Sequence, residues 1–273
     1  MKKLVDFSFN KYSQFGEDGI IEKIFEIIGT KSKTCVEFGA WDGFHLSNTA
    51  NLWTRSWKGV LIEGKKKRFE RLKKNTAEYG CLCIHAFVEI SGDNSLDSLL
   101  KKRGVSNQID LLSIDIDGND YYIFESLNEI TPRVVICEYN PTIPAELDLL
   151  AEKDNYFGCS VTALKKMAEK KGYVLISITQ TNCIFVLEEY AQYFSEFDIR
   201  IESMKNDEYV NYFITSYSGE YVLSKDKLAF GATFPYKKKL LGEHGSVYTC
   251  CSIFRPIFIL FRIMKNYLRE ILE

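Results

Sequence analysis

The chain has 273 residues, 46% of them hydrophobic and 26% charged, and a formal net charge of −2 at pH 7. This length is sufficient for one large α/β domain or for one domain with an additional lobe. Because the net charge is close to zero, we expect no nucleic-acid partner. The eight cysteines have neither zinc-site nor disulfide spacing, and residues 1–5 lack the apolar core of a signal peptide, so we expect a cytoplasmic protein with free thiols.

The first 30 residues predict an arm followed by a helix. Residues 1–12 form the arm, and the apolar residues of 20–28 recur with helical spacing before Gly29, which stands where a helix would end. Acidic and amide side chains alternate with glycines in the turn at 14–19. Two interpretations remain open: the turn supplies helix-entry contacts, or it caps a cofactor pocket with Gln14 as the contact.

The organising feature of the chain is the run from Thr34 to Gly43. A strand over 34–38 ends in a glycine-bounded turn, and a helix is predicted over 47–53. In an open α/β sheet, ligands bind where such a turn leaves the carboxyl end of a strand. The dinucleotide pattern G-x-G-x-x-G would need glycine at Trp41 and Phe44, so a dinucleotide is disfavoured.

Two acidic residues indicate the kind of ligand. Glu37, in the pattern Glu37-x-Gly-x-x-x-Gly43, suits a ligand that has an ammonium group and no phosphate. Glu63 ends the next predicted strand, 60–63, where its carboxylate can accept both hydroxyls of a ribose. Together they look like the S-adenosylmethionine (SAM) site of a Rossmann-like class I methyltransferase.

The next segments complete the cofactor side of the predicted sheet. A helix over 65–74 has a strongly basic face, which is either solvated or bound to phosphate groups of a substrate. A strand over 81–88 follows, and in such sheets the chain leaving this strand borders the adenine. Phe87 and Val88 are therefore candidate ring contacts, and His85 is expected to be a packed strand residue.

Oxygen-bearing side chains gather at the carboxyl ends of two further strands. Strand alternation places Asp115 and Asp117 on one face of the strand that begins at Ile109, and Glu138 and Asn140 on one face of 133–140. Three interpretations remain open. Asp115 or Asp117 is a general base; either one forms a Mg²⁺ or Mn²⁺ site with Glu138 and Asn140; or the acids cap the helix predicted over 121–127.

Two closing strands, 173–179 and 183–187, predict a terminal hairpin and a seven-stranded, mostly parallel sheet with six parallel strands and one antiparallel strand. From Tyr12 to Glu189 the sequence resembles the FkbM-like methyltransferases. The resemblance is carried by the runs 36–43, 61–63, 95–100, 110–118 and 135–140. It implies SAM-dependent O-methylation of hydroxyls, frequently on sugars or natural products. One departure lies at Asp117, where glutamate is commoner in the family, and the resemblance does not extend to the last third of the chain.

The last third, 191–273, is expected to be an accessory lobe rich in aromatic residues. It ends in a strongly apolar helix over 252–272 that is interrupted by arginines and a lysine, and this segment is too short and too charged to span a bilayer. Three roles remain open: docking on its own domain or on a dimer partner, lying in a membrane interface, or binding a partner enzyme.

The sequence as a whole predicts a class I methyltransferase domain at 1–190, with an N-terminal helical cap within 1–30, and a C-terminal extension. The predicted reaction is methyl transfer to a hydroxyl of a small molecule, with a sugar, nucleotide-linked sugar or glycan precursor as the first expectation. The alternative is a non-catalytic SAM-binding or scaffold module. The candidate cofactor contacts are Gln14, Glu37, Gly39, Ala40, Trp41, Asp42, Gly43, Asn48, Glu63, Gly64, Phe87, Val88 and Asp115. The candidate catalytic residues are Asp115 and Asp117, the substrate contacts Glu138, Tyr139 and Asn140, and the metal ligands Asp115, Asp117, Glu138 and Asn140.

Overall fold

The structure is a computed structural model that describes residues 1–215, 217, 221–225, 229–231, 236–240 and 246–250. The chain divides into two compact units, Met1–Asn206 and Asp207–Glu273. The division falls after Asn206, beyond the boundary expected at residue 190. The helix expected over 252–272 lies outside the described residues.

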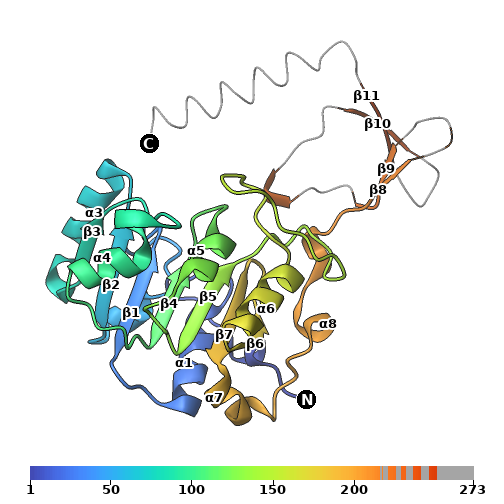
Figure 1. The fold of residues 1–273 in the computed structure, drawn as a ribbon. Coiled ribbons are helices and arrows are strands. Elements are labelled where there is room, and N and C mark those ends of the chain that lie inside the picture. Colours follow the sequence, from blue (N-terminus) through green and yellow to red (C-terminus); the bar gives the residue numbers. More distant parts are fainter. Residues whose placement is uncertain (216, 218–220, 226–228, 232–235, 241–245, 251–273) are drawn as a thin grey trace. The chain divides into compact units, whose positions relative to one another are not determined.

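The first unit is built on one seven-stranded sheet with the strand order β3-β2-β1-β4-β5-β7-β6 (Figure 1). All neighbouring pairs from β3 to β5 are parallel, and β7 runs antiparallel to both β5 and β6. This topology confirms the predicted Rossmann-like sheet with one antiparallel strand. The strands are β1 Thr34–Phe38, β2 Lys58–Glu63, β3 Leu82–His85, β4 Leu111–Ile114, β5 Val134–Glu138, β6 Tyr173–Ile178 and β7 Asn182–Leu187.

Helices cover both faces of this sheet (Figure 1). One apolar cluster joins α1, α2 and α3 to the sheet, and the other joins α4, α5 and α6 to the opposite face. The central strands β1 and β4 are buried at every position, as expected for parallel strands covered on both sides. The α-helices of this unit are α1 Glu17–Ile28, α2 Ala50–Trp53, α3 Lys66–Thr76, α4 Leu96–Lys102, α5 Asp120–Ser126, α6 Val161–Lys170, α7 Glu188–Ala191 and α8 Ile201–Met204, and its 3₁₀ turns are η1 Leu4–Phe7, η2 Ala77–Tyr79, η3 Gly92–Asn94 and η4 Gln192–Phe194.

Several elements differ from their predicted bounds, among them α2, β3 and α1. Helix α2 begins at Ala50 rather than at 47, because Ser47 and Thr49 bind the carboxylate of Glu37 instead of entering the helix. Strand β3 ends at His85, before the predicted end at 88. Helix α1 begins at Glu17, three residues earlier than the apolar periodicity indicated.

The second unit contains a four-stranded antiparallel sheet with the order β10-β11-β9-β8, which the sequence did not predict. Its described strands are β8 Phe213–Thr215, β9 Tyr221–Leu223, β10 Tyr236–Leu240 and β11 Ser246–Cys250, and two 3₁₀ turns, η5 Asp207–Tyr209 and η6 Ala229–Gly231, accompany them. Within the described part of the chain, no helix has the length and apolar character needed to cross a membrane.

Candidate active site

The turn after β1 lies directly against the end of β4. Gly39 has a φ of +76°, and a Cβ at this position would lie 2.1 Å from the backbone oxygen of Asp115. Gly43 is also left-handed, and a Cβ there would lie 2.8 Å from the Thr76 side chain. A side chain at Gly39 would therefore push the turn away from the β4 backbone, and a side chain at Gly43 would displace the α3 side chains that pack there. The glycines of the predicted motif thus allow the β1 turn to approach β4 and α3.

Glu37 fixes the segment that follows this turn. Its carboxylate accepts hydrogen bonds from Ser47 Oγ at 2.6 Å, Thr49 Oγ1 at 2.7 Å and the Asn48 backbone N–H at 2.8 Å. The carboxylate is buried, and burial raises its pKa, although the three donors act in the opposite direction. Asn48 Nδ2 in turn donates to Ser113 Oγ at 3.1 Å, which links the turn to β4.

Glu63 ties the ends of β1 and β2 into one site. It is 5% exposed, and its two oxygens accept the backbone N–H groups of Trp41 at 3.0 Å and Lys65 at 2.7 Å. Each carboxylate oxygen has a second lone pair, so the group can still accept ligand hydroxyls. The structure therefore brings the second predicted acid onto the backbone of the glycine turn.

Phe87 and Val88 have different surroundings. The Phe87 ring is 65% exposed and lies on Gly64, where a Cβ would come within 2.3 Å of the ring. Val88 packs against the apolar cluster on the α4 side. His85 stacks on Phe69 with a centroid distance of 4.8 Å and contacts the Gly64 carbonyl oxygen at 3.0 Å through Nε2, so it is held as a packed residue. Phe87 is the ring available beside Glu63.

The turn before α1 has extensive helix-entry contacts. Asp18 Oδ2 accepts the backbone N–H groups of three consecutive residues, 11 to 13, at 2.8–2.9 Å. Glu17 is fully buried and accepts the Phe15 N–H at 2.8 Å. Gln14 is exposed, and its backbone oxygen accepts from Asn10 Nδ2 at 2.9 Å. The acids of this turn therefore organise the backbone around Gln14.

Three of the four predicted oxygen-bearing residues form a cluster at the ends of β4 and β5. Carboxylate oxygens of Asp115, Asp117 and Glu138 lie within 4.8 Å of one another. Burial is the main cause that raises the pKa of Asp115 to about 8, followed by the charges of Asp120 and Asp117. Burial and then the charge of Asp115 raise the pKa of Glu138 as well. Carboxylates this close favour a shared proton or a cation.

The turn that presents these acids is held by Asp120, the first residue of α5. Its carboxylate accepts the backbone N–H groups of Ile116 and Gly118, both at 2.8 Å. Asp117 has a φ of +61° and an exposed side chain. Asp120 therefore stabilises the turn before α5, no described side chain caps the first turn of this helix, and the carboxylates of Asp115 and Asp117 lie at the edge of the sheet.

Asn140 and Tyr139 have other contacts. Asn140 Oδ1 accepts from the N–H and Oγ1 of Thr142 at 2.9 and 2.6 Å, and its Nδ2 donates to the Phe157 carbonyl oxygen at 2.8 Å. Strand β5 ends at Glu138, so the alternation that grouped Asn140 with Glu138 does not continue to residue 140. Tyr139 is 2% exposed and donates to the Thr179 carbonyl oxygen at 3.3 Å. The structure does not bring these two side chains into the carboxylate cluster.

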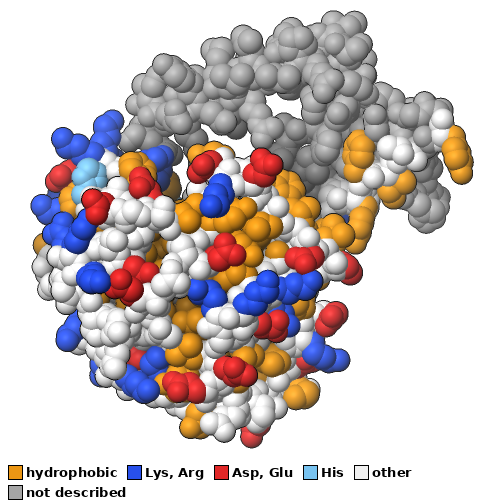
Figure 2. Space-filling model, in the orientation of Figure 1, with side chains coloured by type: hydrophobic (Ala, Val, Ile, Leu, Met, Phe, Trp, Pro, Cys, Tyr) orange, Lys and Arg blue, Asp and Glu red, His pale blue; other side chains and the backbone are white. Residues whose placement is uncertain are grey.

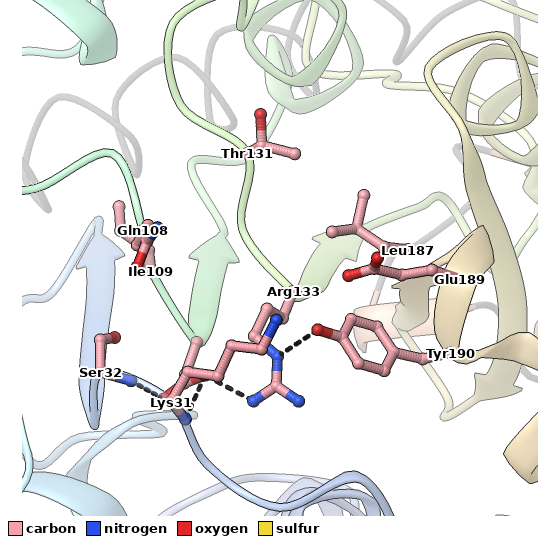
Figure 3. A pocket seen from close by; sticks show the side chains of 10 residues that line it. Lys31, Ser32, Gln108, Ile109, Thr131, Arg133, Leu187, Glu189 and Tyr190 are labelled. Atoms are coloured by element: carbon pink, nitrogen blue, oxygen red, sulfur yellow. Dashed lines mark hydrogen bonds and ion pairs between the residues drawn. The ribbon is translucent and has the colours of Figure 1, made fainter.

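A separate cavity of about 160 Å³ lies at the opposite edge of the sheet (Figure 3). Its central contact is an ion pair at 2.7 Å between Arg133 and the fully buried Asp110. Asp110 also accepts the backbone N–H groups of residues 31 to 33, and Arg133 donates to the carbonyl oxygens of Ile28 and Gly29 and to Tyr190 Oη. These contacts join the end of α1 to β4 and β5, so we assign the cavity a structural role.

Helix α3 carries the basic face that the sequence predicted, and Lys and Arg side chains gather over it in Figure 2. Its lysines are exposed, whereas Leu72 and Thr76 face the core. The Arg68 guanidinium lies over the Trp41 ring at 3.3 Å from its centroid. The basic face therefore begins beside the turn after β1.

Comparison with known proteins gives a match to one family. The model of the methyltransferase FkbM domain matches residues 92–175. This stretch contains α4 to α6 and the acid-ended strands β4 and β5, and it does not include the turns after β1 and β2. A comparison with curated proteins finds no match.

Several solved methyltransferase structures are similar in part. The O-methyltransferase from Bacillus cereus, in complex with SAH, is 16% identical, with a TM-score of 0.42 and coverage of 61% of this chain and 78% of that one. TomG from Streptomyces achromogenes, an O-methyltransferase in complex with SAM, is 15% identical, with a TM-score of 0.42 and coverage of 64% and 82%. A SAM-dependent methyltransferase from Clostridium acetobutylicum is 12% identical, with a TM-score of 0.41 and coverage of 63% and 90%. The family match confirms the resemblance over residues 92–175, which are similar to the methyltransferase FkbM domain.

Proposed function

We propose that the protein is a SAM-dependent O-methyltransferase that acts on a hydroxyl of a small molecule. The observation that carries this proposal is the contact of Glu63 with the Trp41 N–H, which joins the predicted ribose-binding acid to the glycine turn. The carboxylate cluster of Asp115, Asp117 and Glu138 lies at the carboxyl edge of the same sheet. Cofactor and acceptor would therefore meet at the edge where α/β sheets bind ligands.

The residues present fit SAM. Gly39 and Gly64 stand where a Cβ would fill the space beside the Asp115 backbone and the Phe87 ring. In our proposal the backbone of Gly39, Ala40, Trp41, Asp42 and Gly43 binds the amino-acid end, and Glu63 accepts the ribose hydroxyls beside Gly64. Phe87, with Val88 behind it, borders the adenine. Glu37 and Asn48 act by holding the turn in shape and by adding negative charge, and Gln14 covers the pocket. SAM supplies an electrophilic methyl group when bound.

The side chains of the cluster would prepare the acceptor. Asp115 is the better general base of the two candidate acids, because its raised pKa near 8 matches the task of accepting a proton near neutral pH. Asp117 and Glu138 would orient the hydroxyl, with Tyr139 and Asn140 shaping the wall behind them. Holding the hydroxyl in line with the methyl group would supply most of the rate enhancement.

The same three carboxylates allow a second reading, a Mg²⁺ or Mn²⁺ site that would orient and acidify the hydroxyl. Asn140 would not be a ligand, because Thr142 and Phe157 occupy its side chain. We rank the general base first, since the sequence pattern that suggested the metal site included Asn140. EDTA distinguishes the two readings, because only a metal-assisted reaction loses activity and regains it with Mg²⁺.

For the acceptor we propose a sugar, a nucleotide-linked sugar or a glycan precursor, and for the location the cytoplasm, where the free thiols would remain reduced. The family resemblance supports a hydroxylated acceptor. We also propose that residues 252–272 mediate a homodimer or a peripheral association with a membrane. The rival function is a non-catalytic SAM-binding or scaffold module of a glycan-synthesis complex.

The first test is calorimetric titration of the full chain with SAH, with and without EDTA. We expect binding in the micromolar range and a loss of about tenfold or more in Glu63→Gln, since a charged hydrogen-bond acceptor for the ribose is removed. Glu129→Gln is the matched control, because Glu129 is exposed and pairs only with Lys101 among the described contacts. Absence of SAH binding by the wild type would refute the proposed function, and binding without methyl transfer to any hydroxylated acceptor would favour the scaffold.

A further inference from the structure

Strand register extends the carboxylate cluster by one residue that the sequence did not indicate. Ser113 of β4 lies opposite Ile136 of β5, and the residues two positions further along these strands are Asp115 and Glu138. Glu138 lies opposite Asn182 of β7. Glu138 and Asn182 therefore form one row at the carboxyl edge of the sheet, and the Asp115 carboxylate, just beyond the end of β4, lies within 4.8 Å of that of Glu138.

The row lies on the face covered by α1. Ile136 and Ile184, which are two positions from Glu138 and Asn182 on the same face of their strands, both belong to the apolar cluster that contains the α1 side chains. Directly opposed residues of an antiparallel pair have neighbouring side chains on one face. Asn182 is therefore a neighbour of Glu138 rather than a residue of the opposite layer.

The side-chain amide of Asn182 has a hydrogen-bond partner for its nitrogen but none for its oxygen among the described residues. It is 3% exposed, and its Nδ2 donates to Glu17 Oε1 at 3.0 Å. Glu17 is itself fixed by Thr179 Oγ1 at 2.6 Å and by the Phe15 N–H. This contact sets the orientation of the amide, and Asn182 Oδ1 has no hydrogen-bond partner among the described residues. A buried acceptor of this kind calls for a donor.

The carboxylates next to Asn182 also have no ion pair with a basic side chain among the described residues. Among the ion pairs of the described residues, none includes Asp115, Asp117 or Glu138. Carboxylates gathered at a partly buried edge are stabilised by a positive charge placed between them. The four side chains thus present hydrogen-bond acceptors, and a positive charge placed among them would favour the ionised form of the three carboxyl groups.

We propose that Asp115, Asp117, Glu138 and Asn182 Oδ1 form a subsite that binds an ammonium group of a ligand. This inference rests on the proposed function and names the chemistry next to the reacting position of the cofactor. An ammonium carries three N–H donors and the compensating charge, whereas a phosphate or carboxylate in its place would meet three acidic side chains. Asn182 would accept directly from the ammonium through Oδ1, and Glu17 is the positioning residue that holds its amide.

The test compares two ligands that differ at the reacting position. SAH has a neutral thioether there, and sinefungin, a SAM analogue, has an amino group. Titrations with EDTA present exclude a metal as the source of positive charge, and titrations with Mg²⁺ show whether a metal competes. We expect wild-type protein to bind sinefungin about tenfold or more tightly than SAH, as for a charge-assisted contact in a partly buried site.

Two variants test whether the subsite causes the higher affinity for sinefungin. Glu138→Gln and Asn182→Ala should each lower the ratio of the sinefungin affinity to the SAH affinity several-fold relative to wild type, because the ratio cancels any effect on the parts that the two ligands share. A ratio near one in the wild type, or a ratio that neither variant changes, would overturn the subsite and leave the proposed function standing. Absence of SAH binding in the wild type would instead overturn both. If the difference between the sinefungin and SAH affinities appeared only when Mg²⁺ is added, the cluster would be assigned as a metal site and the ammonium subsite would be overturned.

Discussion

Replacing Gly39 by alanine tests whether contact between the β1 turn and β4 builds the site. The left-handed φ of +76° costs an alanine about 1–2 kcal/mol. The new Cβ would also lie 2.1 Å from the Asp115 backbone oxygen, and relieving such a clash costs a further 1–3 kcal/mol or so. We therefore expect a loss of about 2–5 kcal/mol in the free energy of unfolding, because backbone cannot move aside as a side chain can.

Gly80→Ala is the matched control for this substitution. Gly80 has a φ of +68°, and a Cβ there would have nothing within 4 Å, so only the backbone strain of about 1–2 kcal/mol applies. Urea unfolding followed by circular dichroism measures both variants, and SAH titration measures the site. We expect Gly39→Ala to weaken SAH binding at least tenfold and Gly80→Ala to leave it unchanged. Equal stability and equal SAH affinity in the two variants would refute the reasoning.

Three further predictions concern single side chains. Phe87→Ala should weaken SAH binding about tenfold and leave urea stability within about 0.5 kcal/mol, because the ring is 65% exposed; unchanged affinity would remove Phe87 from the adenine site. The raised pKa of Asp115, about 8, means that the folded state keeps a proton that the unfolded state has lost, so this group lowers stability progressively as pH rises from about 4 to 8. Urea midpoints across this range should fall less for Asp115→Asn than for wild type, and parallel profiles would contradict the assignment. Asp110→Asn should lower the free energy of unfolding by about 3 kcal/mol, because it leaves Arg133 buried without its counter-charge. Asp93→Asn, which breaks an exposed ion pair, should lower it by less than about 1 kcal/mol. Similar losses in the two variants would show that burial does not strengthen the Asp110–Arg133 pair.

The sheet could be predicted from sequence because its signals are local. Runs such as 34–38 and 134–138 are mostly apolar and have an acid as their last or penultimate residue, as central parallel strands with a functional edge do. The glycines of 39–43 and the acid at 63 have fixed distances along the chain from these strands. Local spacing was therefore enough to predict that Glu63 lies near the turn after β1, as its contact with the Trp41 N–H shows.

The partners of the site residues could not be predicted in this way. The donors to Glu37 come from residues 47 to 49, which had a helical pattern, and the competition between helix entry and carboxylate binding is decided only by tertiary contacts. Asn140 was grouped with Glu138 by an alternation that ends when the strand ends. Asn182 gave no signal, because its pairing with Glu138 depends on β7 inserting between β5 and β6.

The bonds of Glu17 to Thr179 and Asn182 join positions 162 and 165 residues apart. Synthesis at the ribosome is vectorial, so the cofactor-side strands emerge long before the partners of Glu17. Closing a loop of this length costs about 4–5 kcal/mol of chain entropy, which the fully buried carboxylate can regain only once β7 has paired. In a nascent chain that stops before β7, Glu17 would lack the hydrogen bonds that Thr179 and Asn182 donate to it in the complete fold. The two sides of the sheet therefore form at different stages of biosynthesis, and the side that contains β7 and β6 is the last to form.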